Sequence, residues 1–161
     1  MKTLLAQFAA YNFWANELFA ACIQAMHAQT MEGNNNALHA TLLHIWDEES
    51  IWWQRMKLQE QIVLPSATAA HVNAVAKGLL EQSRQWASWT QAAQEHMLEH
   101  EFIYRNSKRQ TFKQPVHQTL LHVFNHSTQQ RGQLTAHLQL LKLSKIPQTN
   151  FMDWSRSRGF K

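Results

Sequence analysis

The 161-residue sequence contains few of the residues that interrupt helices or cross-link chains. It has three prolines, four glycines and one cysteine. Because proline and glycine break helices, the proline-free stretches before Pro65 and over residues 66–114 favour an all-α protein. The single cysteine, Cys22, excludes an internal disulfide and argues against a cysteine-based zinc site. Its apolar neighbours predict a buried thiol rather than a nucleophile.

Long hydrophobic runs are also missing. Polar side chains at Gln7, Asn12 and Asn16 interrupt the apolar residues near the N-terminus, so we do not expect this segment to act as a secretory signal. No stretch approaches the roughly 20 apolar residues that a membrane-spanning helix needs. We therefore expect a cytoplasmic protein that has no membrane partner.

Acidic residues are scarce in the last third of the chain. The formal net charge of +4 arises from −5 over residues 1–104 and +9 over residues 105–161. A basic segment can bind nucleic acid, an anionic ligand or an acidic surface of another subunit, and a solvated helix face is the commonest explanation. The basic residues are scattered and no recognition motif accompanies them, so we do not expect a nucleic-acid partner.

Apolar residues recur at three- and four-residue steps in four stretches of the chain, which predicts four amphipathic helices. We expect these helices at about 3–28, 37–59, 69–98 and 115–143. The segment Phe102–Phe112, in which two short apolar runs flank a polar turn, predicts a small β-hairpin. The whole chain, 1–161, is therefore expected to form one all-α domain, a four-helix bundle with a hairpin before the last helix.

Particular residues are expected to mark the ends of these helices. Gly33 and the asparagines at 34–36 should separate the first two helices. Thr68 is expected to cap the third helix, and Pro115 suits the first turn of the fourth. Gly132 lies within the fourth helix, where either a close approach of another helix or room for a ligand would explain it.

Two of the ten histidines occupy positions that suit a binding site. His44 and His126 each lie at the margin of the buried stripe of their own helix. Glu48 follows His44 by one turn, and His122 precedes His126 by one turn. Imidazoles on two helices are a common way to bind a divalent metal ion. Ordinary structural histidines with hydrogen-bonded rings are the alternative.

Several motifs, in this order along the chain, resemble those of the DinB family. They are residues 11–16 (YNFWAN), 42–52 (LLHIWDEESIW), 122–133 (HVFNHSTQQRGQ) and 150–154 (NFMDW). The resemblance covers nearly the whole chain. It implies a four-helix bundle with an up-down-down-up course, commonly assembled as a homodimer.

The resemblance also implies a metal site. In that family one histidine from the second helix and two histidines four residues apart on the fourth surround a divalent metal such as zinc or nickel. The corresponding positions here are His44, His126 and Gln130. An amide oxygen is a weaker ligand than imidazole for these metals, so the site is expected to be altered. Water, Glu48 or His122 could complete it.

Better-understood members of the superfamily are metal-dependent transferases or isomerases that use low-molecular-weight thiols. The resemblance therefore implies a metal ion that lowers the pKa of a thiol. Arg131 could contact a carboxylate of such a thiol cofactor. The alternative is a metal-free bundle that binds a small ligand or another protein. The sequence assigns no catalytic residue.

Overall fold

The computed structural model describes residues 1–29, 36–68 and 71–159. Four long helices dominate these residues: α1 (Lys2–Gln29), α2 (Asn36–Met56), α3 (Val72–Ala92) and α5 (Val116–Leu140). The shorter elements are η1 (Pro65–Ala67), α4 (Glu95–Glu99), β1 (Glu101–Arg105), β2 (Thr111–Pro115) and α6 (Phe151–Ser157). The predicted all-α fold with a small hairpin is confirmed.

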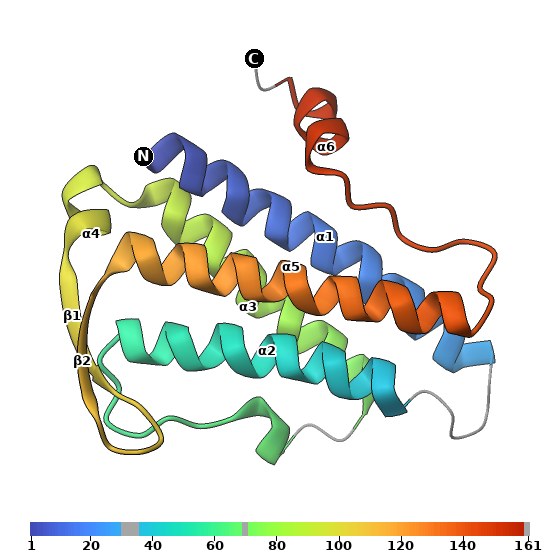
Figure 1. The fold of residues 1–161 in the computed structure, drawn as a ribbon, viewed down its shortest axis with the longest axis horizontal. Helices are drawn as coiled ribbons and strands as arrows, with labels where there is room; N and C mark the ends of the chain where they lie inside the picture. Colours follow the sequence, from blue (N-terminus) through green and yellow to red (C-terminus); the bar gives the residue numbers. More distant parts are fainter. Residues whose placement is uncertain (30–35, 69–70, 160–161) are drawn as a thin grey trace.

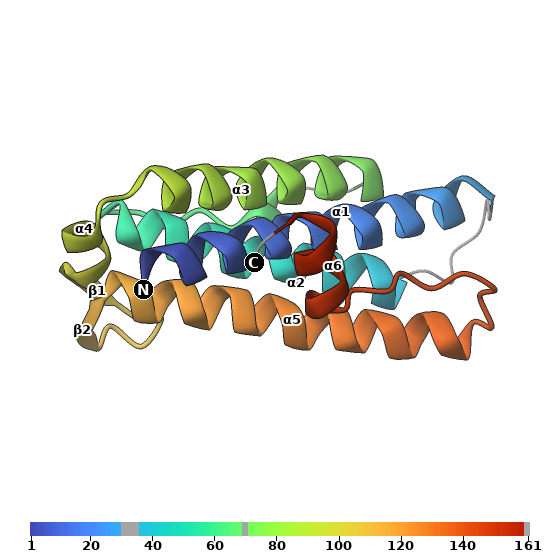
Figure 2. The same ribbon diagram turned by 90° about the horizontal axis from the view of Figure 1, so that it is seen from above.

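The helices α1 and α5 run in one direction, and α2 and α3 run in the other (Figure 1). The segment between α2 and α3 returns along the length of the bundle, so these two consecutive helices are parallel. Helix α1 packs against α3 and α5, and α2 packs against the same two helices (Figure 2). This is the predicted up-down-down-up course.

Apolar side chains from all four long helices fill the interior. The predicted inward stripe of α2 is buried at Leu38, Leu42 and Ile45. Near the hairpin end, Trp86 of α3 and Phe124 of α5 meet edge to face with ring centroids 6.4 Å apart. This burial is the main force that holds the helices together.

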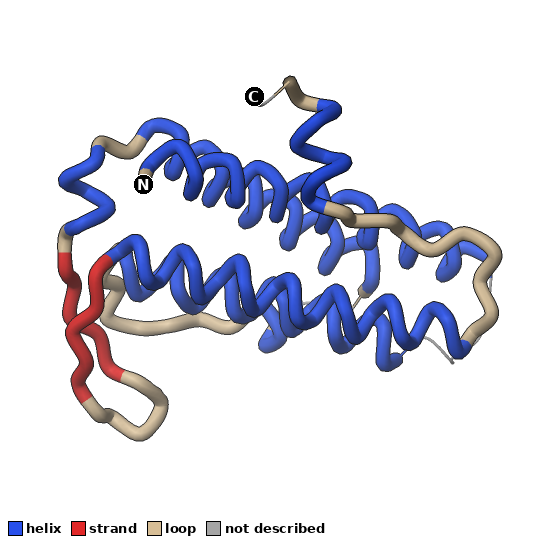
Figure 3. Tube along the Cα trace, turned by 45° about the horizontal axis from the view of Figure 1, so that its top comes forward, coloured by secondary structure: helices blue, strands red, loops and turns tan. Residues whose placement is uncertain are grey.

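The hairpin closes one end of the bundle, where the chain passes from α4 into α5 (Figure 3). Strands β1 and β2 pair antiparallel, with Tyr104 opposite Phe112. Phe102 points into the core and is only 4% exposed. Near the C-terminus, Trp154 of α6 packs on Tyr11 of α1 with ring centroids 5.6 Å apart, and this contact holds the C-terminal segment against the bundle.

The predicted third helix, 69–98, is too long at both ends. Helix α3 begins at Val72 after His71 in an extended conformation, and residues 69–70 lie outside the described part of the chain. Thr68 does not cap it, because the N-cap position is occupied by His71, and Thr68 instead ends η1 with its N–H donating to the Pro65 carbonyl. At the other end Ala93 is extended, and the chain turns there to bury Ala93 and Leu98.

The predicted ends of the second and fourth helices are also a few residues too late. Helix α2 ends at Met56 because Leu58 adopts a left-handed backbone with φ 54°. Helix α5 ends at Leu140, shortly before Lys142 with φ 53°. Neither residue is a glycine, so the usual signal for a helix C-terminus is missing at both positions. Gly33 and the asparagines at 34 and 35 lie outside the described residues.

Two helical glycines have opposite surroundings. Gly132 is exposed, and a Cβ added there would meet nothing within 4 Å, so the first of the two explanations for Gly132, a close approach of another helix, is wrong. A Cβ added at Gly78 of α3 would instead overlap the indole of Trp46 on α2. Gly78 is therefore the glycine that lets two helices approach closely.

Over the described residues, no helix is long and apolar enough to cross a membrane.

Candidate functional site

The bundle brings the two predicted imidazoles together. His44 on α2 and His126 on α5 meet edge to face, with ring centroids 5.0 Å apart. His44 is exposed and His126 is partly buried, so the pair lies at the rim of the α2–α5 interface. This spacing allows one nitrogen of each ring to reach a shared ion at the usual bond length of about 2.0–2.1 Å.

Gln130 lies one helical turn beyond His126 and is 8% exposed. Its Nε2 is 3.4 Å from His126 Nε2. If the amide donates in this contact, the ring proton of neutral His126 must sit on Nδ1. That Nδ1 is buried and has no partner among the described residues. Gln130 thus competes for the lone pair of His126 that would otherwise bind a metal ion.

Other polar groups surround the pair. His122 stacks near His126 with ring centroids 6.3 Å apart, and its other neighbour is Trp52 at 5.1 Å. Burial lowers the pKa of His126, the Glu48 carboxylate opposes this shift, and His44 and His122 add to it. His126 is therefore held in the neutral form, which is the form that can bind a metal ion.

The donor set fits two positions of a metal site and departs from the third. A catalytic zinc site has about three protein ligands, and a ligating histidine normally donates its second ring N–H to a partner. Within residues 1–29, 36–68 and 71–159, no three His, Cys, Asp or Glu side chains are grouped so that they could hold a metal ion. His126 Nδ1 also lacks the usual partner among those residues. The described side chains therefore fit a site with two imidazoles.

A buried polar network lies beside the imidazole pair, centred on the fully buried Glu49 of α2. Its carboxylate accepts hydrogen bonds from Asn12 Nδ2 (2.8 Å), Asn16 Nδ2 (3.0 Å), Ser83 Oγ (2.7 Å) and Ser127 Oγ (3.2 Å). Burial raises the pKa of Glu49, and these hydrogen bonds and the charge of a nearby arginine only partly offset it. The network ties α2 to α1, α3 and α5.

Arg131 belongs to the same network. Its Nη1 donates to Asn12 Oδ1 and Asn16 Oδ1, each at 2.7 Å, and its Nη2 donates to Thr128 Oγ1 at 2.9 Å. The side chain is 2% exposed, and burial lowers its pKa to about 10. This placement gives Arg131 a structural role within the bundle. Its contact with a ligand carboxylate stays a prediction.

The sequence contains a signal for this network that the spacing of apolar residues does not reveal. Asn12 and Asn16 are one turn apart on the buried side of α1, and Glu49 continues the apolar stripe of α2. Polar residues at inward positions of two helices predict mutual hydrogen bonding, because buried polar groups are rarely unpaired. Ser127 and Arg131 each follow a predicted site residue directly, so the network fixes the backbone that presents His126 and Gln130.

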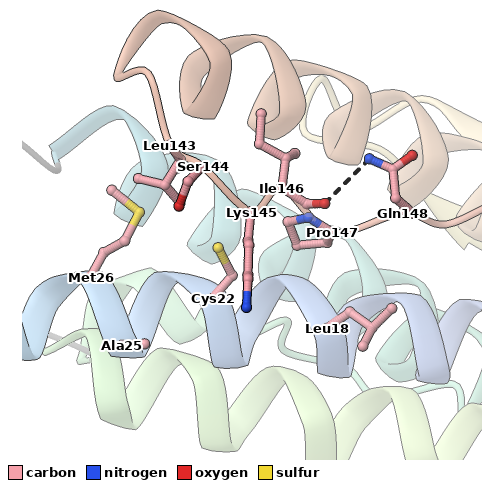
Figure 4. Close-up of a pocket in the computed structure, with 10 residues that line it drawn as sticks. All are labelled: Leu18, Cys22, Ala25, Met26, Leu143, Ser144, Lys145, Ile146, Pro147 and Gln148. Carbon is pink, nitrogen blue, oxygen red and sulfur yellow. Dashed lines mark hydrogen bonds between the residues drawn. The ribbon is translucent and has the colours of Figure 1, made fainter.

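A separate cavity of about 520 Å³ lies between α1 and the segment 143–148 that follows α5 (Figure 4). Cys22 and Met26 line it from α1, and Lys145 and Ile146 line it from that segment. Burial raises the pKa of the Cys22 thiol, which disfavours the thiolate. Among the described residues that line it, none is a histidine that could act as a base for this thiol.

Comparison with known proteins agrees with this architecture. The family model described as DinB family matches residues 1–154. No curated protein matches the sequence. The match spans all four long helices, both strands and the imidazole pair. The chain therefore belongs to the DinB family.

Proposed function

We propose that this protein is a divalent-metal-dependent enzyme of the transferase type, in which a thiol cosubstrate completes an altered metal site. The observation that supports it most directly is the edge-to-face pair of His44 and His126 on facing helices, 5.0 Å apart. These two imidazoles would hold zinc or nickel, and Gln130 would stand at the third position. When bound, the ion would lower the pKa of a coordinated thiol.

The side chains around the pair suit this role. His126 is kept neutral by burial, so a metal ion that displaces the Gln130 amide could bind it without loss of a proton. His44 is exposed, which leaves an open approach for a ligand from solvent. With two imidazoles the protein alone should bind the ion weakly. A thiolate is a strong ligand for these metals, so it would supply the donor that Gln130 does not.

The test is a titration of the purified protein with Co²⁺, with and without glutathione. Tetrahedral Co²⁺ with a thiolate ligand has intense visible and near-ultraviolet bands. We expect these bands only when protein and glutathione are both present, and we expect their loss in His126→Ala. His137→Ala is the matched control, because His137 is a partly buried histidine on the same helix. Bands that persist in His126→Ala would refute the assignment.

Activity is then measured as thioether formation between glutathione and an aryl chloride, with release of chloride. The reaction should need added metal and should fail in His44→Ala and His126→Ala.

Dimerisation and a cytoplasmic location are further parts of the proposal. Light scattering of the purified protein should give the mass of two chains.

A second function is favoured by one contact. Gln130 Nε2 faces His126 Nε2 at 3.4 Å and would occupy the metal-binding lone pair. On this reading the protein is a metal-free bundle that binds a small ligand or another protein. It predicts no cobalt bands in the native protein under either condition.

A further inference from the structure

A small cavity of about 270 Å³ lies between the C-terminal end of α2 and strand β1, and the proposed metal chemistry does not use it. Three apolar side chains line it: Leu58, Ile62 and Ile103. All three are exposed to solvent, at 65%, 37% and 60%. Apolar walls that remain open to water are a common feature of ligand sites.

Arg55 lines the same cavity and has an unusual environment. Its Cζ lies 4.7 Å from the ring centroid of Trp52 and 5.2 Å from that of Tyr104. Stacking on two aromatic faces orients the guanidinium and partly offsets its burial. An arginine whose guanidinium is oriented in this way can pair with a planar anion.

Arg55 has a polar atom that makes no hydrogen bond within the described part of the chain. Its Nε is buried and has no hydrogen-bond partner among the described residues. Over the same residues, no carboxylate lies within ion-pair distance of its guanidinium. Because protein atoms cover Nε, an acceptor in the cavity would have to pair with the Nη groups at the tip of the guanidinium.

The charge of the cavity favours an anion. Arg55 and Arg105 line it together with one acid, Glu60, so positive charge is in excess. Burial lowers the pKa of Arg55, while Tyr104 and Glu48 oppose this shift. The guanidinium stays protonated at neutral pH, because arginine is not deprotonated in proteins.

We propose that this cavity binds a small carboxylate with a hydrocarbon tail, whose acid group pairs with Arg55 and whose tail packs against Ile62 and Ile103. A carboxylate matches the planar fork of arginine and can accept from both Nη groups. The apolar wall selects a tail over a bare ion. The volume lies just below the range of about 300–1,000 Å³ for drug-sized ligands, which limits the tail to a short one.

The first experiment uses hexanoate and the wild-type protein without metal. The Nε–H resonances of the arginines are followed by NMR in nitrogen-labelled protein, and the Arg55 signal is identified by its absence in Arg55→Lys. Hexanoate should shift this signal along a saturating curve. Acetate, which lacks the tail, should bind at least roughly tenfold more weakly. Hexanol, which lacks the charge, should leave the signal in place.

Variants separate the two halves of the site. Hexanoate binding to the variants is measured by isothermal titration calorimetry, because Arg55→Met lacks the reporter signal. Arg55→Met should abolish hexanoate binding, and Arg84→Met should not, although Arg84 also lies over an aromatic ring, 5.3 Å from that of Phe13. Ile103→Ala should weaken hexanoate binding and leave acetate binding unchanged. Leu140→Ala is its control, because Leu140 is 81% exposed and lies on α5 outside the cavity.

Three results would overturn the proposal. They are a wild-type Arg55 signal that hexanoate does not saturate, equal affinity in Arg55→Met, and inorganic phosphate binding at Arg55 more tightly than hexanoate. If Arg55→Met does not fold, the wild-type titrations and Ile103→Ala still decide the question. None of these measurements depends on the metal site.

Discussion

Replacement of Arg131 by methionine should lower the free energy of unfolding by about 3–5 kcal/mol, because the buried polar network would lose the positive charge of the guanidinium while keeping its acceptors. Within the described residues, the guanidinium donates three hydrogen bonds of 2.7–2.9 Å. Its removal leaves the Oδ1 atoms of Asn12 and Asn16 without these donors. Each buried acceptor left unpaired costs about 1–3 kcal/mol.

Glu49→Gln perturbs the other side of the network. The new amide turns an N–H donor toward groups that already donate to Glu49, so we expect a loss of about 2–3 kcal/mol. In the double variant with Arg131→Met, that same N–H can donate to the Asn12 or Asn16 oxygen that lost its arginine. The two losses should therefore fall short of additivity by at least about 1 kcal/mol.

The assay is urea denaturation followed by tryptophan fluorescence, with stability taken from the midpoint at constant slope. Arg84→Met is the control, because that exposed arginine makes one cation–π contact worth at most about 1 kcal/mol. A loss below about 1 kcal/mol in Arg131→Met, or strict additivity in the double variant, would refute the coupling between Glu49 and Arg131 through the asparagines.

Three further predictions concern single positions. Gly78→Ala should lower the free energy of unfolding by at least about 2 kcal/mol because its Cβ would overlap the Trp46 indole, whereas Gly132→Ala should raise it by up to about 1 kcal/mol; equal effects in urea denaturation would contradict this contrast. Because burial raises the pKa of Glu49, its stabilising contribution is present below the ordinary pKa of 4.5 and is lost as pH rises through the folded pKa. The free energy of unfolding of the wild type, relative to that of Glu49→Gln, should therefore fall as the pH rises above 4.5, by no more than about 1.4 kcal/mol per pH unit. A relative free energy that rises with pH would show that the pKa of Glu49 is lowered instead. Burial also raises the pKa of Cys22, so iodoacetamide should modify it more slowly than it modifies free glutathione at pH 8, and faster reaction would exclude that shift.

The spacing of apolar residues was sufficient to predict the four long helices, because their buried stripes repeat over many turns. The ends of the helices were harder to predict. Leu58 and Lys142 have left-handed backbone conformations, which glycine usually favours. Helix α3 ends just before Ala93, where an extended backbone lets Ala93 and Leu98 be buried. These stops depend on tertiary packing, and no local residue type announces them.

The candidate site was likewise predictable from the sequence only in part. Position on the helix placed His44 and His126 correctly at the margin of the core, and the structure brings their rings together. Helical spacing on one element cannot reveal partners on another. The hydrogen bonds of Glu49 with Asn12 and Ser83 join residues 37 and 34 positions apart, so they follow only once the helices are assembled.

The proposed metal site is tested most directly by a Ni²⁺ titration of the wild type and Gln130→His, with no thiol present. Restoring the third imidazole should raise the affinity by at least roughly tenfold, which is about 1.4 kcal/mol. The wild type should reach comparable affinity only when glutathione is added. If Gln130→His binds no more tightly than the wild type without thiol, His44, His126 and position 130 do not form a metal site in this protein.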